Sequence, residues 1–421
     1  MSVVGLALLF GALAFGTASA REGLRVVGHD EGPQVVASAS LYLSLSDMDA
    51  QVADVLLMGN GYDAQRAAAL KRYEQRRAEV GDTLLRARGL AEGDAPAIRT
   101  ITSVLAGLGR YERLAAQALL LNEQAGHQPG PPPRAVLDRY REASDVMQKV
   151  LLPQAYNLTL ENATTVRHTH ERERTSIRVT VVAVVVIGAG AVGCLVWLQV
   201  YLARRFRRVF GPALLVATAL TALSALSGAA VLNGQATTLD TAKRDGFDSV
   251  LVLARARAIA NSMHADQSRF LLDPERADTY QHTYLDKSQA LMYVDAPNLG
   301  AYQDKVAGTS RYLGLLGTEL AERPSPEVVT AYQGFQQADR AMRALPAVAA
   351  VAERMGGVRT GFEGYDTSLV RLSDGHRAVY TRAVADGDGA LDGLWRVLPF
   401  GIVAIGAAVV AGVRPRLKEY R

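Results

Sequence analysis

The sequence predicts an all-α fold: a four-span membrane protein with two tandem extracytoplasmic four-helix-bundle domains. Three observations lead to this class: long apolar segments, an arginine-rich connection between the middle two, and two polar regions of nearly equal length with helical patterning. An apolar run of about 20 residues can cross a bilayer as a helix. The expected transmembrane helices cover residues 2–20, 179–202, 210–232 and 394–413.

The connection 203–209 sets the expected topology. It contains four arginines, Arg204, Arg205, Arg207 and Arg208. Short cytoplasmic loops are enriched in Lys and Arg, so this loop is expected in the cytoplasm. The bundles 21–178 and 233–393 then lie outside, and the tail 414–421 lies inside. We expect a multi-pass protein of the cell (cytoplasmic) membrane with both termini cytoplasmic.

The first apolar segment has two interpretations. Ala18-Ser19-Ala20 resembles a signal-peptidase site, whereas the run before it could remain as an anchor. A signal peptide and a membrane anchor both normally follow a Lys or Arg, and no Lys or Arg precedes this segment. The true start of the protein could therefore lie further upstream. A retained span is favoured because it completes a symmetric set of four.

The basic charge follows this topology. The chain has a net charge of +4 and a pI near 9.1. The central loop alone equals that net charge and the tail adds Arg414, Arg416 and Lys418, so the remaining chain is net negative. These basic residues are candidate contacts for a cytoplasmic partner or anionic membrane lipid, although membrane orientation alone accounts for their presence. We expect no nucleic-acid binding.

The two polar regions share an ordered set of short matches, which predicts an internal repeat. Met48-Asp49-Ala50 corresponds to Met263-His264-Ala265, residues 106–111 correspond to 307–312, and Leu152-Pro153 corresponds to Leu345-Pro346. Each match alone is weak, but their common order favours duplication.

Helical spacing of apolar residues predicts four helices in the first copy. They cover 34–58, 63–90, 95–124, and 134 onward into the second span. The second copy repeats this pattern, with breaks near 273–274, 296–297 and 323–326.

Two prolines and one glycine-rich stretch are expected to disturb the fourth helices. Pro153 and Pro346 are expected inside them, where a proline removes a backbone hydrogen bond and kinks the helix. Residues 356–366, with several glycines, are expected to interrupt the second copy's fourth helix.

No motif predicts catalysis. Residues 188–193 fit the G-x-G-x-x-G pattern, but the apolar run continues far beyond one strand, so small residues such as Ala189 and Gly193 are interpreted as sites of close helix approach. The histidines lack ligand spacing, and the single cysteine, Cys194, lies in a span. We therefore expect a protein that is not an enzyme and has no cofactor or metal.

The repeated Arg-Tyr pairs are the candidate ligand site. An arginine fork beside an aromatic ring suits a carboxylate, as in an amino acid. The alternative is a bundle scaffold, with a packed tyrosine and an ion-paired arginine, and repetition in both copies favours it. The pairs are Arg110-Tyr111 and Arg311-Tyr312.

The twin helical regions resemble the four-helix sensor modules of bacterial chemoreceptors and histidine kinases. The resemblance rests on Met-x-Ala, then Phe/Val-Leu-Leu, then a helix bearing Tyr73 or Tyr284. Two such units with four spans are similar to the actinobacterial GlnX transmembrane signalling proteins. That resemblance implies an extracytoplasmic amino-acid-binding lipoprotein, GlnH, and a cytoplasmic serine/threonine kinase as partners.

The leading hypothesis is a non-enzymatic transmembrane signal transducer that relays amino-acid availability from the lipoprotein to the kinase, with a homodimer as a further hypothesis. One alternative is a direct small-ligand sensor. Another is a structural or accessory subunit of a transporter or envelope complex. Copurification with permease subunits would favour this last alternative.

Overall fold

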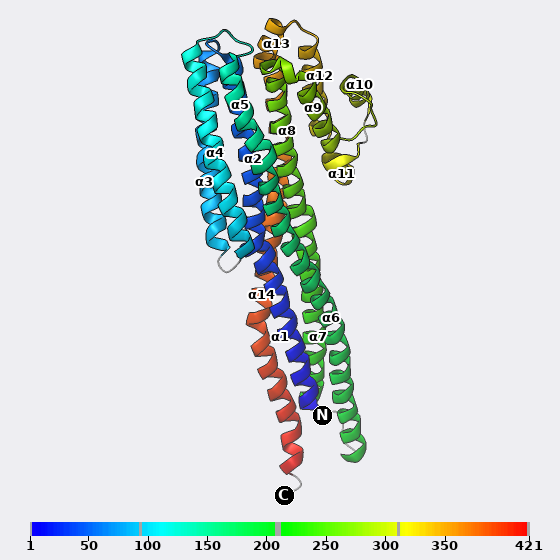
Figure 1. Cartoon of the computed structure of the whole chain (residues 1–421). Helices are drawn as coiled ribbons and strands as arrows, with labels where there is room; N and C mark the ends of the chain where they lie inside the picture. The colour runs from blue at the N-terminus through cyan, green and yellow to red at the C-terminus, as the bar shows by residue number, and fades with distance from the viewer. Residues whose placement is uncertain (1, 92–94, 207–211, 310–311, 419–421) are drawn as a thin grey trace. The chain divides into compact units, whose positions relative to one another are not determined.

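The computed structural model describes residues 2–91, 95–206, 212–309 and 312–418. Across these ranges the chain is helical, apart from turns and one antiparallel bridge between Tyr293 and Leu313 (Figure 1). Four helical stretches are long and apolar enough to cross a membrane. These findings confirm the predicted all-α class, whereas the tandem duplication stays a prediction.

The helices of the first half begin and end close to the predicted positions. They are α1 (Ser2–Leu24), α2 (Glu31–Met58), α3 (Asp63–Leu90), α4 (Ala95–Ala125), α5 (Arg134–Val146) and α6 (Leu152–Phe206). Short π-helical segments connect α1 to α2 and α5 to α6, namely η1 (Arg25–Asp30) and η2 (Met147–Leu151).

The helices of the second half are more interrupted. They are α7 (Pro212–Asp240), α8 (Ser249–Leu272), α9 (Ala277–Leu291), α10 (Leu299–Gly308), α11 (Gly314–Glu322), α12 (Pro326–Arg343), α13 (Ala347–Glu353) and α14 (Arg359–Lys418). The short segments between them are η3 (Thr241–Asp248), η4 (Pro274–Arg276) and η5 (Arg354–Val358).

Three features of the second half differ from the predictions. The expected third helix is divided into α10 and α11, with Tyr293 bridging to Leu313 at the break. Pro346 precedes the first residue of α13 with extended backbone, so it starts a helix instead of kinking one. Residues 356–366 do not interrupt the helix, because the π turn η5 accommodates the glycine pair and leads directly into α14.

Pro153 lies in the first turn of α6, directly after η2. The backbone N–H of Leu152 donates to the carbonyl of Met147, which is five residues earlier. A proline cannot donate to the carbonyl four residues before it, and a π turn is a common local adjustment of a helix. The wider π turn thus lies next to the position where Pro153 cannot donate the usual backbone hydrogen bond of an α-helix.

The chain forms two compact units. The apolar unit comprises residues 1–33, 164–247 and 378–421, and the bundle unit comprises 34–163 and 248–377. Most of both polar regions, which were expected to form two bundles, belongs to the bundle unit.

Within the apolar unit, α1 packs against α7. Close approach of α6 to α7 occurs at Gly188, where an added Cβ would lie 2.6 Å from the Cβ of Ala225. An added Cβ at Gly193 would meet no described atom within 4 Å. The close contact expected of the small residues is therefore made by Gly188 and not by Gly193.

The core of the bundle unit includes side chains from both halves. Val351 and Met355 belong to the same buried apolar cluster as Leu56 and Tyr111 of the first half. Apolar periodicity predicts which face of a helix is buried, but it does not say which helix covers that face. This is why the shared core was not expected.

Candidate functional site

Helix α2 carries three buried aspartates on a largely apolar segment. Asp47 accepts hydrogen bonds from the Nε atoms of Arg72 and Arg76 on α3, at 2.8 and 2.7 Å. Asp49 and Asp54 instead reach residues of the second half. A buried carboxylate needs a cation or several hydrogen-bond donors beside it, so each of these aspartates requires a partner close to it in space.

Arg269 of α8 is the centre of the first contact between the halves. It is 1% exposed and forms ion pairs with Asp49 of α2 and with Asp266 of its own helix. Its Nε donates to the hydroxyl of Tyr140 on α5, at 3.0 Å. Lys287 of α9 contacts the other Asp266 oxygen at 2.5 Å. Two cations therefore face two carboxylates inside the bundle unit.

Arg354 of η5 makes the second contact. Its Nη2 donates to Asp54 Oδ1 at 2.7 Å and to the carbonyl of His264 at 3.0 Å. Ser268 donates to the same Asp54 oxygen at 2.5 Å. An aspartate of the first half is thus held entirely by groups of the second half, and Arg354 is fully buried.

Arg141 of α5 makes the third contact, near the surface. It donates through Nε and Nη2 to the two carboxylate oxygens of Asp273, at 2.8 and 2.5 Å. Nη2 also donates to Glu275 at 2.8 Å. We call this contact region between the halves the seam; the residues that define it are Asp49, Asp54, Arg141, Arg269, Asp273 and Arg354.

Buried tyrosines next to the seam resist ionisation. Burial raises the pKa of Tyr73 from 10.0 to about 12, and the carboxylate of Glu112 adds to the rise. Burial also raises the pKa of Tyr111 well above 10.0, and Asp49 adds to that rise. The hydroxyl of Tyr111 points to Asp49 Oδ1 at 3.4 Å, a weak hydrogen bond at most.

These shifts predict loss of stability in alkali. Above pH 10 the unfolded chain loses phenol protons that the folded protein keeps, so the tyrosine contribution is complete below pH 10 and is lost as pH rises towards about 12. Thermal denaturation of the full-length protein across this range should show a falling Tm. Tyr73→Phe should make the fall shallower, because it removes one of the phenols whose pKa burial raises. A constant Tm between pH 10 and 12 would contradict the assignment.

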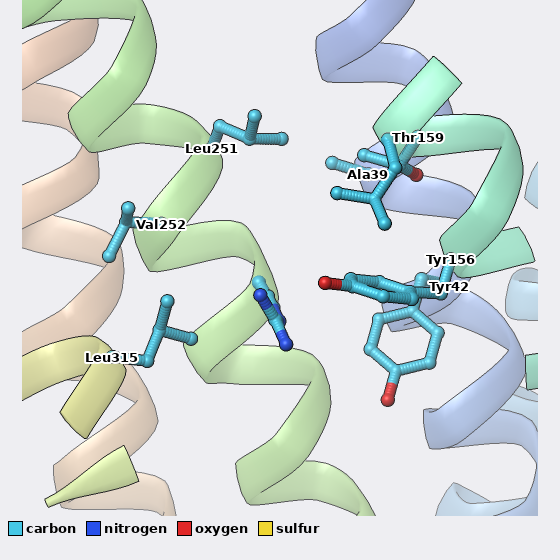
Figure 2. A pocket seen from close by; sticks show the side chains of 9 residues that line it. Ala39, Tyr42, Tyr156, Thr159, Leu251, Val252 and Leu315 are labelled. Carbon is cyan, nitrogen blue, oxygen red and sulfur yellow. The ribbon is translucent and has the colours of Figure 1, made fainter. Parts of the chain in front are cut away.

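A cavity of about 110 Å³ lies between the same two halves, lined by residues other than the six that define the seam. Figure 2 shows Tyr42 of α2 and Tyr156 of α6 on one side, opposite Leu251 and Val252 of α8. The Arg255 guanidinium also lines the cavity and lies 4.4 Å from the centroid of the Tyr156 ring. Burial raises the pKa of Tyr42, and the positive charge of Arg255 partly opposes that rise. We call this space the seam cavity.

The structure describes three of the four residues of the predicted Arg-Tyr pairs. Arg110 is exposed on α4, whereas Tyr111 is fully buried, so the two side chains point to different environments. Tyr312 is also buried, and its hydroxyl lies 2.6 Å from the carbonyl of Thr309. Arg311 lies outside the described residues. Both tyrosines therefore occupy positions that fit the scaffold interpretation.

The predicted cytoplasmic residues are only partly described. Arg204 is exposed near the end of α6, and Arg205 lies in the same helix. Arg207 and Arg208 lie outside the described residues. The last turns of α14 contain the three basic residues of the tail, Arg414, Arg416 and Lys418.

The charged seam residues were missed by sequence reasoning. One signal was available: Asp47, Asp49 and Asp54 stand in a helix whose other residues from 48 to 58 are mainly apolar. Carboxylates on a buried face need partners, which makes them candidates for tertiary contacts. Arg269 and Arg354, the partners of Asp49 and Asp54, are more than 200 residues away in the sequence, so no local pattern connects them.

Comparison with known proteins gives one match. Residues 23–171 match the family model described as an actinobacterial sensor domain. This region contains α2 to α5, and hence Asp49, Asp54 and Arg141 of the seam. No curated protein and no solved structure matches the chain. The match, together with the four apolar helices, supports a membrane-located sensor protein of the actinobacterial type.

Proposed function

We propose that this chain is a non-enzymatic transmembrane signal transducer. In this proposal it relays amino-acid availability outside the cell membrane, through an amino-acid-binding lipoprotein, to a cytoplasmic serine/threonine kinase. The sensor-domain match over residues 23–171 supports the sensing role. The lipoprotein and the kinase come from the GlnX resemblance, and an accessory role in a transporter complex is the competing account.

Helix continuity is the observation that carries the proposal. Four helical stretches, 2–58, 134–206, 212–272 and 347–418, each contain residues of both the bundle unit and the apolar unit. A continuous helix can transmit a small shift or rotation along its length, as in known signalling transitions. Each stretch includes a π turn, a local feature that is frequent at functional positions in helices.

The seam offers a way for the two halves to respond together. Asp49 and Asp54 of α2 bind arginines from α8 and η5, so movement of one half changes the surroundings of buried charges in the other. Buried ion pairs depend strongly on geometry, because desolvation is offset only when the partners remain in contact. A partner that binds one half would therefore affect both halves.

The output is proposed to lie at the basic loop and tail. Neutralising Arg204, Arg205, Arg207 and Arg208 to glutamine and removing residues 414–421 should abolish the change in kinase-dependent phosphorylation that follows amino-acid addition to cells. The matched control is Arg340→Gln, at an exposed position in the bundle unit. Surface labelling must show that the variants still insert. An unchanged phosphorylation response in correctly inserted variants would overturn the proposed output.

Partner capture tests the relay independently. Crosslinking in intact cells, followed by purification of the full-length protein and mass spectrometry, should recover a solute-binding lipoprotein together with a cytoplasmic kinase. Recovery of permease subunits without a kinase would support the accessory-subunit alternative. Recovery of the protein alone would favour direct sensing, for which the seam cavity is the specific observation.

A further inference from the structure

Arg255 differs from the other arginines of α8 in having no acidic partner in the described part of the chain. Arg257, two residues further on, donates to both oxygens of Asp366 at 2.7 and 2.9 Å, and Arg269 binds two aspartates. Among the described residues, no carboxylate forms an ion pair with Arg255. Its contact is with the ring of Tyr156, at the wall of the seam cavity.

Arg255 lies over the Tyr156 ring, and no described residue accepts a hydrogen bond from its guanidinium. A guanidinium that lies over an aromatic face directs its N–H groups along its own plane, away from the ring. That planar fork matches the two oxygens of a carboxylate. Arg255 is also the only charged residue among the nine described residues that line the cavity. The cavity therefore favours an anion.

The remaining lining restricts the size and polarity of the ligand. Ala39, Leu160, Leu251, Val252 and Leu315 supply aliphatic surface from both halves. A dry cavity of roughly 150 Å³ holds benzene, which has six non-hydrogen atoms, so a space of 110 Å³ encloses a ligand body of about four such atoms. The ligand body is thus small and apolar.

The absence of an acidic residue in the described lining separates two classes of carboxylate. An α-amino acid carries an ammonium group beside its carboxylate, and the described lining offers it only neutral hydroxyls, of Tyr42, Tyr156 and Thr159, so burying that cation without a counter-charge is costly. A simple carboxylic acid brings no such group. The lining therefore selects against free amino acids, although both classes would satisfy Arg255.

We propose that the seam cavity binds a small apolar monocarboxylate, held by Arg255 and packed between the aliphatic side chains of the two halves. This inference deepens the proposed sensing function, on which its biological meaning rests. Because the lining comes from α2 and α6 on one side and α8 and α11 on the other, the ligand stabilises the contact between the two halves. Amino-acid signals would then arrive through the partner lipoprotein, and the monocarboxylate would be a second input.

Three related probes test this site on the purified full-length protein. Isobutyrate has the required charge and size, isobutyramide has the same number of non-hydrogen atoms without the charge, and 2-aminoisobutyrate adds the α-ammonium, which is one further non-hydrogen atom. Millimolar isobutyrate should raise the Tm by about 2–4 °C through selective binding to the folded state. Isobutyramide and 2-aminoisobutyrate should each bind about ten-fold more weakly or worse. Isobutyramide lacks the negative charge that Arg255 binds, and 2-aminoisobutyrate brings an ammonium group that finds no carboxylate in the described lining.

Variants locate the binding to the cavity. Arg255→Met should weaken isobutyrate binding at least about ten-fold, and Val252→Phe should weaken it by filling the space. Arg340→Met, at an exposed position, should bind like the wild type. The Tm of each variant without ligand must be close to that of the wild type, and the two cavity variants provide independent tests if one is unstable.

Three outcomes would overturn the site: no isobutyrate effect, equal binding of 2-aminoisobutyrate, or full binding by Arg255→Met. These measurements use neither the lipoprotein nor the kinase. Suppose that the purified protein binds isobutyrate, but cells lacking the protein keep a normal phosphorylation response to amino acids. The proposed relay would then be wrong, and the proposed binding site would stand. If cells lacking the protein lose the phosphorylation response, but the purified protein does not bind isobutyrate, the relay would stand and the binding site would be wrong.

Discussion

Arg269→Met is expected to lower the free energy of unfolding of the bundle unit by about 3–5 kcal/mol. Methionine preserves much of the packed stem but leaves the Asp49 carboxylate buried without its cation. Lys287 still contacts Asp266, whereas the other donors near Asp49, Tyr111 and Gln148, lie 3.4 Å away. The large effect comes from leaving the Asp49 carboxylate buried without a cation, and not from a large net contribution of the ion pair to the free energy of unfolding.

Circular dichroism during denaturation of the full-length protein measures this effect, with hydrogen exchange in α2 and α8 to locate it. The two tryptophans, Trp197 and Trp395, belong to the apolar unit, so their fluorescence reports the other part of the chain. Combining Asp49→Leu with Arg269→Met should recover most of the lost stability, because replacement of both partners removes the unpaired charge.

The matched control is Arg139→Met. Arg139 forms an exposed pair with Glu142 on α5, and such surface pairs contribute about 0–1 kcal/mol. If Arg139→Met and Arg269→Met had equal effects, the buried pairing would not be a major stabilising contact of the bundle unit.

Gly59→Ala is expected to destabilise the bundle unit by about 3 kcal/mol. Gly59 has a φ of 51° in the turn between α2 and α3, and its Cβ would lie 2.4 Å from the backbone carbonyl oxygen of His127. That oxygen already accepts a hydrogen bond from the backbone N–H of Asn60 at 2.9 Å. Neither the left-handed backbone nor the close carbonyl can adjust without breaking this connection.

Gly81→Ala is the matched control with the opposite sign. Gly81 lies inside α3, where an added Cβ meets no described atom within 4 Å. Alanine should stabilise this helix by about 0.5–1 kcal/mol, because it loses less conformational entropy on folding. Chemical denaturation of both variants measures the pair. A similar loss of stability in both would show that Gly59 has no special backbone role.

Most of the fold was predictable because its signals are local. Apolar runs define the spans, and helical periodicity predicts α2, α3, α4 and the start of α5 within a few residues. Prediction was weaker in the second half. The break between α10 and α11 depends on a bridge between Tyr293 and Leu313, and the continuous α13–η5–α14 depends on a π turn at glycines that normally indicate a break.

The candidate site was much less predictable than the fold. Tyr111 and Tyr312 are recognisable as packing residues, yet Arg255 looks in the sequence like any other arginine on α8. Its distinction is the absence of a described acidic partner and the presence of Tyr156 from the other half. Both depend on neighbours that are distant in the sequence.

The sequence by itself determined the helical class, the number of apolar segments long enough to span a membrane, and most helix limits in the first half, since these follow from composition and spacing within one segment. Only the tertiary structure decided that the two polar regions belong to one compact unit, that Arg269 and Arg354 bind aspartates of the first half, and that a cavity lies between Tyr156 and Val252. The physical reason is that a buried apolar or charged side chain requires a partner, but the chain pattern does not state which distant residue provides it.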